Sequence, residues 1–215
     1  FITARAGTLL SDINNTLFTY GQMLGFDPPN CSARTTIGGV IATGLSGSRR
    51  PYSGPARDYV LGVRCINGLG KDLSFGGQVI KNVAGYDLSR LMTGAFGTLG
   101  IILEVSIKVV PIPEAEMTCS RSMTKGNAIV KMLELSGQAI SLSGSCYCGG
   151  VLYVRLSGNE NSIMATKKKI GFDTDEHGVN LWAQLRDFKA PIFNTEKNIW
   201  RISVPITADP KIGDA

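Results

Sequence analysis

The chain has 215 residues, of which 43% are hydrophobic and 18% charged, with a formal net charge of +5. This composition is typical of a folded globular protein and excludes a disordered or collagen-like chain. No run of about 18 apolar residues is present, so no membrane-spanning helix is predicted. The basic residues are dispersed, apart from one short run at 167–169 that resembles the polar side of a helix, and do not form the stripe expected of a nucleic-acid-binding protein.

The first half of the chain predicts one clear helix and several short strands. Residues 9–24 carry apolar side chains at helical spacing, and Ser11 or Asp12 stands near the start of this helix. The apolar positions are Leu10, Ile13, Leu17 and Tyr20. Alternating or β-branched segments bounded by glycine or proline predict three strands, over 59–67, 69–77 and 100–111.

A glycine-rich stretch, "TIGGVIATGLSGSRRPYSG" at 36–54, lies between this helix and the strands. It contains five glycines and no histidine, cysteine or carboxylate, and it has neither the P-loop nor the Rossmann glycine spacing. Because glycine permits φ > 0 and close approach to the backbone, two interpretations stay open. The stretch forms a bulge in a β-rich domain, or its backbone N–H groups surround an anion such as a phosphate.

The second half predicts the order β-α-β-β-α-β, as in a split-βαβ sheet under two helices. Thr124 is a candidate N-cap for the first helix, Gly137 a stop signal, and Gly149-Gly150 the break of a hairpin. The two helices are expected over 124–137 and 159–171, and the strands over 116–123, the hairpin 138–158, and 198–205.

Glycine and charge divide the chain into two domains. Residues 1–110 hold 17 of the 26 glycines and 10 Lys+Arg against 6 Asp+Glu, whereas the remainder has 12 against 11. The basic, glycine-rich half is therefore the one suited to an anionic cofactor. The segment 111–116 has two prolines followed by acidic residues and predicts a linker, which leaves 117–215 as the second domain.

The five cysteines are scattered and odd in number, which argues against a disulfide framework and favours a reducing compartment. Cys146 and Cys148 form a single C-x-C pair, which favours buried thiols over a zinc site. His177 is the only histidine and lies in a polar run, so neither a histidine metal cluster nor a histidine-based triad is expected.

Three segments together resemble one protein family: Asp27–Pro29, the stretch 36–68 and the stretch 79–111. They are similar to the FAD-binding fold of vanillyl-alcohol oxidase and related flavoenzymes, the PCMH type, and more closely to the FAD-binding E subunit of glycolate oxidase. The resemblance implies an α+β chain. Residues 1–110 would be the second subdomain of a PCMH-type FAD-binding domain, with a mixed or antiparallel sheet and helices. Residues 117–215 would be a partial, ferredoxin-like cap domain.

The resemblance also implies FAD as the cofactor, bound without a covalent histidyl link because the FAD half contains no histidine. Small residues and converging amides would let the pyrophosphate and the flat ring approach the backbone closely. The positions that match the cofactor-binding residues of the family are Pro29, Thr36, Gly38, Gly39, Ala42, Thr43, Gly44, Gly47, Tyr52, Gly100, Ile101 and Ile102.

Four further residues have alternative interpretations. Arg49 and Arg50 would neutralise an FAD phosphate, hold a substrate carboxylate in a guanidinium fork, or simply lie in a surface loop. Lys81 and Tyr86 match a segment that runs beside the flavin in the family. They would polarise the ring, or make structural hydrogen bonds.

By this resemblance the protein is an FAD-dependent subunit of a 2-hydroxy-acid oxidase. It would oxidise glycolate to glyoxylate together with a flavoprotein D-type subunit, and pass electrons to an iron–sulfur F-type subunit. The family pattern implies a chain truncated at both ends, and a cytoplasmic place, associated with the inner face of the membrane through partners. Two alternatives stay open: an assembly subunit that has lost FAD binding, and another FAD-dependent D-2-hydroxy-acid dehydrogenase.

Overall fold

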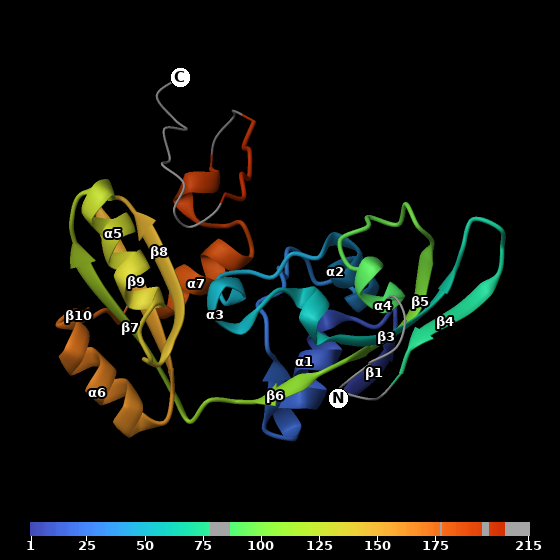
Figure 1. Ribbon diagram of the computed structural model, residues 1–215, viewed down its shortest axis with the longest axis horizontal. Helices are drawn as coiled ribbons and strands as arrows, with labels where there is room; N and C mark the ends of the chain where they lie inside the picture. The colour runs from blue at the N-terminus through green and yellow to red at the C-terminus, as the bar shows by residue number, and fades with distance from the viewer. Residues whose placement is uncertain (78–86, 177, 195–197, 205–215) are drawn as a thin grey trace.

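The computed structural model describes residues 1–77, 87–176, 178–194 and 198–204, and Figure 1 shows them as two α+β halves joined by one extended segment. The first half is built on a four-stranded antiparallel sheet in the order β1-β5-β3-β4. Its strands are β1 (Ile2–Arg5), β3 (Val60–Ile66), β4 (Asp72–Gly76) and β5 (Ile101–Ile107). A separate ribbon pairs β2 (Gln22–Leu24) with β6 (Val109–Pro111). The strands predicted over 59–67, 69–77 and 100–111 are therefore confirmed, the last divided into β5 and β6.

Four short helices accompany this sheet: α1 (Leu10–Thr19), α2 (Ile37–Thr43), α3 (Arg50–Ser53) and α4 (Leu88–Leu91). Residues Ala56–Tyr59 add a 3₁₀ turn. The predicted first helix is confirmed, but neither Ser11 nor Asp12 caps it, because the N-cap position is Leu9. The helix ends at Thr19, so Tyr20 lies outside it and is 75% exposed, contrary to its predicted place on the buried face.

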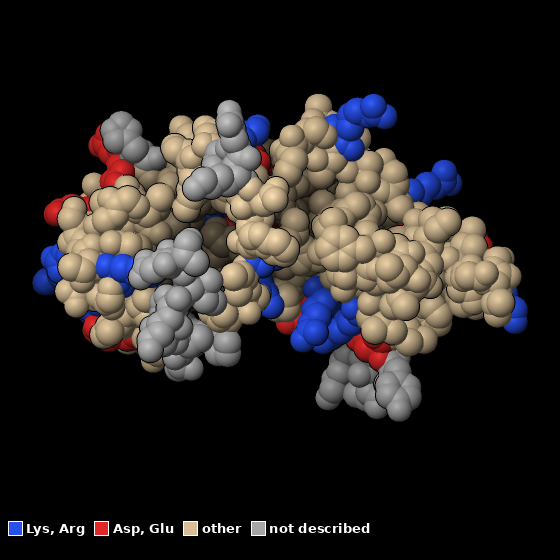
Figure 2. All heavy atoms as spheres, turned by 90° about the horizontal axis from the view of Figure 1, so that it is seen from above, with Lys and Arg blue, Asp and Glu red and all other residues tan. Residues whose placement is uncertain are grey.

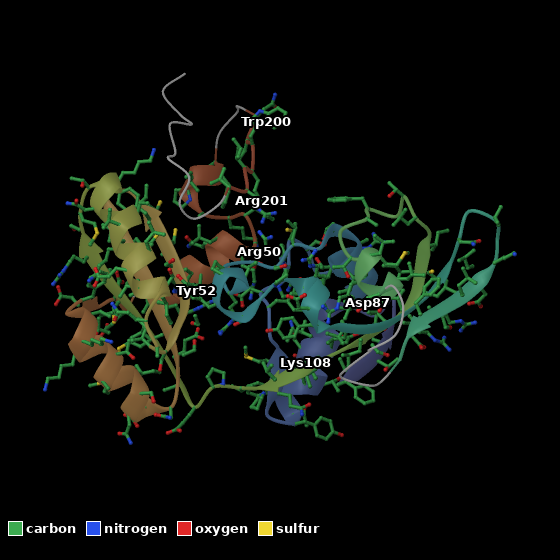
Figure 3. The ribbon with its side chains drawn as sticks, viewed as in Figure 1. Arg50, Tyr52, Asp87, Lys108, Trp200 and Arg201 are labelled. Carbon is green, nitrogen blue, oxygen red and sulfur yellow. The ribbon has the colours of Figure 1, made fainter. Side chains whose placement is uncertain are left out.

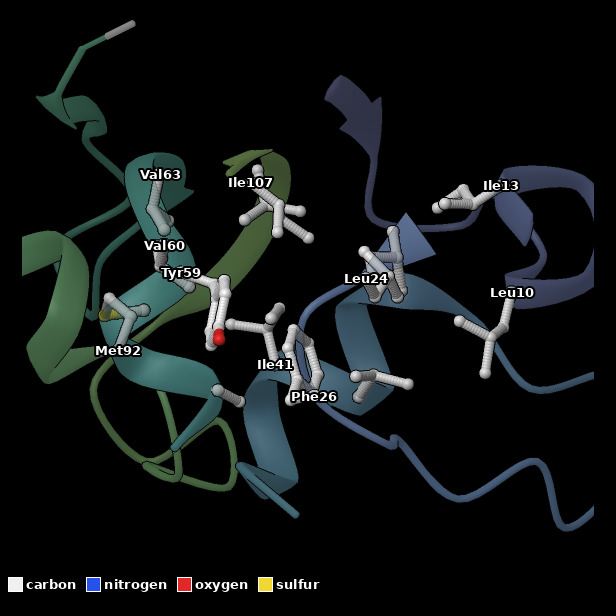
Figure 4. Packing of buried hydrophobic residues seen from close by; sticks show 14 of the residues in the cluster. Leu10, Ile13, Leu24, Phe26, Ile41, Tyr59, Val60, Val63, Met92 and Ile107 are labelled. Carbon is white, nitrogen blue, oxygen red and sulfur yellow. The ribbon is translucent and has the colours of Figure 1, made fainter. Parts of the chain in front are cut away.

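The core of the first half lies between α1, α2 and one face of the sheet, as Figure 4 shows. Leu10, Ile13 and Leu17 bury one side of α1, as their spacing predicts. Phe26 packs against Tyr59, with ring centroids 5.5 Å apart, at the centre of the cluster. The burial of these large side chains holds the glycine-rich helix α2 firmly against the sheet.

The second half has the predicted split-βαβ order. Its elements are β7 (Ala115–Ser122), α5 (Lys125–Ser136), β8 (Leu142–Cys148), β9 (Val151–Gly158), α6 (Glu160–Ile170) and β10 (Asp173–Thr174). The sheet order is β10-β7-β9-β8 with every neighbouring pair antiparallel. Thr124 accepts a hydrogen bond from the Asn127 amide as the N-cap of α5, and Gly137 follows its last residue. Gly149 and Gly150, both with positive φ, make the hairpin turn.

The end of the second half differs from the prediction. The fourth strand is β10 at Asp173–Thr174, whereas residues 198–204 form neither helix nor strand, so the strand expected over 198–205 is wrong. A helix that was not predicted, α7 (Gly178–Arg186), and a 3₁₀ turn at Pro191–Phe193 follow β10. The buried side chain of Trp182 anchors α7, and the polar run before it resembled a solvated turn.

Strand β9 separates the two faces of the second sheet. Leu152, Val154 and Leu156 alternate along it and face the cluster formed with α5 and α6. Arg155 points to the opposite face, where its guanidinium lies over the Trp182 ring of α7, 4.9 Å from the centroid. The two hydrophobic clusters of the molecule fall on either side of residues 112–114, the only positions between β6 and β7. The domain boundary itself remains a prediction, for which limited proteolysis is the measurement.

Candidate functional site

The structure brings the two predicted cofactor motifs together. The glycine-rich stretch folds into α2, and the turn that precedes β5 runs beside the end of this helix. The amide of Gly94 donates to the Ile41 carbonyl at 3.0 Å, and the amide of Phe96 donates to the Ala42 carbonyl at 2.9 Å. Residues 41–42 and 94–96, which are distant in sequence, therefore lie side by side.

The first turn of α2 does not form a nest of free amides. Thr36 is the N-cap and its hydroxyl accepts from the Gly39 amide at 3.4 Å. The amide of Ile37 donates to the Thr8 carbonyl, and that of Gly38 donates to the Ala6 carbonyl. Both acceptors lie just after β1. Three donors that would have surrounded an anion are thus already bonded within the protein. Both interpretations of this stretch, the bulge and the anion nest, are wrong for residues 37–43, which are helical.

Two neighbouring glycines of α2 have different roles. A Cβ on Gly38 would lie 2.6 Å from the Cβ of Ala6, so only glycine allows α2 to pack against the segment after β1. Gly39 is exposed, its φ is not positive, and a Cβ there would meet nothing closer than the Thr36 hydroxyl at 3.5 Å. Since glycine weakens a helix, an exposed glycine without steric need leaves room for another molecule at the backbone.

The turn that follows Gly94 exposes three apolar side chains. Phe96, Leu99 and Ile101 are 70%, 47% and 66% exposed. Gly100 lies at the start of β5, where a Cβ would be 2.6 Å from the Ile66 carbonyl oxygen, and Ile102 packs against the core. Three exposed apolar side chains within six residues make this turn a candidate for a surface that another molecule covers.

Five polar residues form an interface cluster between the halves: Asp27, Ser48, Arg49, Glu116 and Arg155. Arg49 donates to Asp27 at 3.0 Å and to Glu116 at 2.5 Å. Arg155 donates to the other Asp27 oxygen at 2.8 Å and to the Ser48 hydroxyl at 3.1 Å. Only 8% of Arg49 and 4% of Arg155 is exposed. Arg49 is therefore committed to internal carboxylates, and its interpretation as a surface-loop residue is wrong.

Asp27 is the centre of the interface cluster. Burial by itself raises the pKa of this carboxyl, but Arg155, Arg49 and the Ser48 hydroxyl outweigh burial and hold the pKa below its ordinary value. Asp27 is therefore ionised at neutral pH and joins a loop of the first half to β9 of the second. Asp27 belongs to the segment 27–29 that carries the family resemblance, but the sequence pattern predicts no role for it. Arg155 was not predicted as a site residue either. The charge inside the apolar strand "VLYVRLSG" is nevertheless a signal that the second face of that strand is polar.

Tyr52 is also a contact between the halves. Its hydroxyl lies 2.7 Å from the Ser145 hydroxyl of β8. Burial raises the pKa of Tyr52 and outweighs the opposing effect of this hydrogen bond, so the phenol is neutral at physiological pH. Its predicted part in cofactor binding would be that of a neutral hydrogen-bonding group and not of a base.

A cavity of about 780 Å³ opens where the two halves and the C-terminal segment meet, and the surface seen from above is hollowed there (Figure 2). Its walls include Pro29, Gly47, Cys146, Trp182, Phe188 and Trp200. Burial raises the pKa of Cys146 to about 11, with Cys148 adding to the shift, so Cys146 is a neutral thiol and a weak nucleophile at neutral pH. Of the predicted cofactor residues, Pro29 and Gly47 line this cavity.

The remaining predicted residues are dispersed. Arg50 is exposed on α3, on the side that faces Arg201 (Figure 3), and Thr43 uses its hydroxyl to donate back to the Gly39 and Val40 carbonyls within α2. Gly44 ends α2 with a positive φ. Lys81 and Tyr86 lie outside the described residues. Asp87, which follows them, caps α4 by accepting from the Arg90 amide at 3.1 Å.

No helix in the described part of the chain is long and apolar enough to cross a membrane. The same residues contain no group of three or more histidine, cysteine or carboxylate side chains placed to hold a metal ion.

Comparison with known proteins agrees with this geometry. Residues 1–76 match the FAD binding domain family. The chain is 45% identical to the glycolate oxidase subunit GlcE of Escherichia coli (strain K12) over 207 residues, which cover 96% of this chain and 59% of that protein. It is 38% identical over 116 residues to the glycolate oxidase subunit GlcD of Bacillus subtilis (strain 168), covering 54% of this chain and 24% of the relative. A D-lactate dehydrogenase of Archaeoglobus fulgidus is 36% identical over 106 residues, 49% of this chain and 24% of that enzyme.

The fold is also that of a solved alkyldihydroxyacetonephosphate synthase, with a TM-score of 0.63 and 16% identity over 86% of this chain and 45% of the other. The family match confirms FAD as the cofactor type of the first half, and the α+β fold class is confirmed. The chain spans about three fifths of the GlcE relative and a quarter of the GlcD relative. The first 76 residues thus match an FAD binding domain, the chain is similar to the glycolate oxidase subunit GlcE over nearly its whole length, and the solved structure shares its fold.

Proposed function

We propose that this chain is the FAD-binding part of a 2-hydroxy-acid oxidase subunit of the glycolate oxidase type. The observation that carries the proposal is the open backbone at Gly39, next to the exposed apolar turn 96–101, in a chain 45% identical to GlcE. A glycine that neither packing nor φ requires is suited to a molecule that approaches the helix from outside. The residues predicted to contact FAD on this surface are Thr36, Gly39, Ala42, Thr43, Gly44, Gly100, Ile101 and Ile102.

Two electrons and two protons leave glycolate as glyoxylate forms, and bound FAD would supply the electron acceptor. The part of this chain is to bind and orient. The α2 surface would offer close backbone contact, and the apolar side chains of Phe96, Leu99 and Ile101 would exclude water from one side of the bound molecule. The pyrophosphate would need donors other than the first amides of α2, since those are bonded internally.

The partners belong to the same proposal. A D-type flavoprotein subunit would complete the oxidase, and an iron–sulfur F-type subunit would receive the electrons. Association with the inner face of the membrane, from the cytoplasm, would then come through these subunits.

The experiment is to produce the chain together with D-type and F-type subunits, purify the assembly, and measure its FAD content and glycolate-dependent reduction of a dye. We expect Gly39→Val to lower FAD content and turnover while the subunits still co-purify. Phe18→Ala, which removes an exposed side chain on α1, is the matched surface control and should leave both unchanged. Full FAD content in Gly39→Val would contradict the proposed surface.

One alternative is an assembly subunit without FAD, and a specific observation favours it: three amides of the supposed anion site already have internal partners. Assignment of the flavin to individual subunits of the purified assembly separates the two, because FAD titration into the isolated chain is expected to give little binding in either case. Because several charge-assisted hydrogen bonds at about 1.5–3 kcal/mol each would come from elsewhere, we expect weak binding or none by this chain alone. An assembly that oxidises glycolate with no flavin assignable to this subunit would favour the assembly role. Preference for another 2-hydroxy acid would indicate a different dehydrogenase.

A further inference from the structure

A second, smaller cavity lies beside the end of α2 and is lined largely by basic side chains. It measures about 320 Å³, and the C-terminal segment closes one side of it. Three arginines from three parts of the chain line it: Arg50 from α3, Arg57 from the following 3₁₀ turn and Arg201 from the C-terminal segment. We call this cavity the basic pocket. Figure 3 shows Arg50 and Arg201 approaching the same region from opposite sides.

The charge of the basic pocket is largely uncompensated. Arg50 contacts the Ser203 hydroxyl at 3.4 Å, and within the described parts of the chain neither Arg50 nor Arg201 forms an ion pair. Arg57 has one carboxylate near it, Asp58 at 3.8 Å, which Arg90 shares at 3.5 Å. Three guanidinium groups thus converge on a small space with less than one negative charge to balance them, and this arrangement favours an anion.

Thr93 supplies an independent observation. It lines the basic pocket, and its hydroxyl is the buried side-chain polar atom for which the described residues offer no hydrogen-bond partner. A buried hydroxyl without a partner is costly, and an ordered water, an ion or a ligand is a usual partner of such a group in native proteins. A hydroxyl donor beside three guanidinium forks matches an oxyanion with several acceptor oxygens.

We propose that the basic pocket binds a small, doubly charged oxyanion, which is the chemistry shared by a phosphate group and a short dicarboxylate. An anion of charge −2 would balance the net positive charge of the three arginines, one of which is partly neutralised by Asp58. The guanidinium groups would each hold an oxygen edge of the anion, and Thr93 would donate one further hydrogen bond. Of the pocket residues only Gly44 belongs to the proposed FAD surface, so the basic pocket would hold an anion separate from FAD, and Arg50 would serve this anion and not an FAD phosphate.

The test is isothermal titration of the 215-residue chain with inorganic phosphate, with succinate and with acetate. We expect at least one of the two dianions to bind and acetate to bind more weakly. Phosphate alone would identify a phosphate group as the ligand, and succinate alone a dicarboxylic acid. Loss of one charge-assisted hydrogen bond corresponds to a weakening of about tenfold or more, which is the expected effect of Arg57→Gln and of Thr93→Val.

Thr93→Val has a second readout. Since it removes an unpartnered buried hydroxyl at nearly constant shape, it should leave the melting temperature of the free chain unchanged or raise it while it weakens the anion. Arg34→Gln is the matched control, because it removes the same charge from an exposed position outside the pocket and should leave the affinity unchanged. The proposal fails if neither dianion binds, if Arg34→Gln weakens binding as much as Arg57→Gln, or if Thr93→Val leaves the affinity intact. FAD content of the assembled enzyme tests the proposed function separately.

Discussion

Two groups of arginines, which are adjacent in sequence only at Arg49 and Arg50, have opposite environments in this fold. In the interface cluster, Arg49 and Arg155 are almost fully buried and every charge faces a carboxylate, Asp27 or Glu116. In the basic pocket, Arg50 and Arg201 line a cavity without a carboxylate partner among the described residues, and Arg57 shares the carboxylate of Asp58 with Arg90. Arg49 and Arg50 are adjacent and chemically identical. The two differ in whether a carboxylate neutralises them. Arg49 is paired with carboxylates and holds the halves together, whereas Arg50 is not and remains available to a ligand.

The difference follows from the cost of burial. An arginine taken out of water without a partner is strongly destabilising, so Arg49 and Arg155 require Asp27. An arginine beside an open cavity keeps much of its hydration, so the lack of a carboxylate partner costs little and its charge remains available. The comparison predicts large effects on stability at the interface cluster, and small ones elsewhere.

The largest expected effect is that of Asp27→Asn. This change leaves two buried guanidinium groups facing a neutral amide, and removal of one partner from a buried ion pair typically costs about 3–5 kcal/mol. We expect the urea midpoint of unfolding to fall accordingly. Asp72→Asn is the matched control: its partner Arg64, at 2.6 Å, is half exposed, so the midpoint should stay close to that of the unchanged chain. If the two substitutions lowered the urea midpoint equally, the distinction between buried and exposed arginine–carboxylate pairs would be wrong.

Acid should act on the same contacts. The pKa of Asp27 is lowered in the folded chain, as is that of Asp187, which accepts from the Asn30 amide across the halves at 2.9 Å; in both, ion pairing and hydrogen bonds outweigh the opposing effect of burial. A lowered folded pKa contributes stability that is present above the unfolded value near 4 and is lost as the pH falls through the folded value. We therefore expect the urea midpoint to decrease as the pH falls below about 4.

The matched measurement is the same acid titration on Asp27→Asn. If Asp27 carries the effect, the dependence of the midpoint on pH below 4 should be flatter in this variant. An identical slope in both chains would place the acid sensitivity elsewhere.

Gly38→Val and Gly39→Val should separate packing from binding. The valine at 38 collides with Ala6, and overpacking of this kind costs about 1–3 kcal/mol. The valine at 39 enters open space on a helix, where it replaces a residue of lower helix propensity, so the melting temperature should stay level or rise slightly. Thermal melting of both variants is the measurement. A large drop in Gly39→Val would show that Gly39 is a packing residue after all.

The smallest effect is expected for Tyr52→Phe. It removes one neutral hydrogen bond between the halves, worth about 1 kcal/mol, and leaves the ring in place. Ser145→Ala removes the other partner, and the double variant should lose no more than about the larger of the two single losses. Losses that simply add would indicate that the two hydroxyls do not stabilise each other.

Much of the fold could be predicted from the sequence because its signals are local. The spacing of Leu10, Ile13 and Leu17 specifies α1, and the threonine at 124 and glycines at 149–150 place the ends of α5 and of the hairpin. The glycine-rich stretch was predicted wrongly, because it forms a helix over 37–43 and not a bulge or an anion nest. Glycine is unusual in a helix, and the reason for Gly38 is a contact with Ala6 that lies about thirty residues away in the chain.

The interface cluster and the basic pocket could not be predicted for a related reason. Asp27, Arg49 and Arg155 share no local motif, and they meet only because β9 turns its polar face toward the first half. Helix α7 was missed because its anchor is a single residue, Trp182, whose indole donates to the Thr118 hydroxyl of β7 at 2.9 Å. Such contacts depend on how the two sheets are placed against each other. The periodicity of residues along one strand carries no information about that placement.

The stacking of Trp182 on Arg155 gives the chain an optical reporter of its own. Of the two tryptophans in the sequence, Trp182 is 4% exposed against the interface cluster, whereas Trp200 is 84% exposed on the C-terminal segment. Their emission should differ in wavelength and in access to a dissolved quencher such as acrylamide. Separation of the halves would uncover Trp182 and shift its emission to the red, while Trp200 would already be solvated. Opening of the interface can therefore be followed by fluorescence without a label, as a signal distinct from global unfolding.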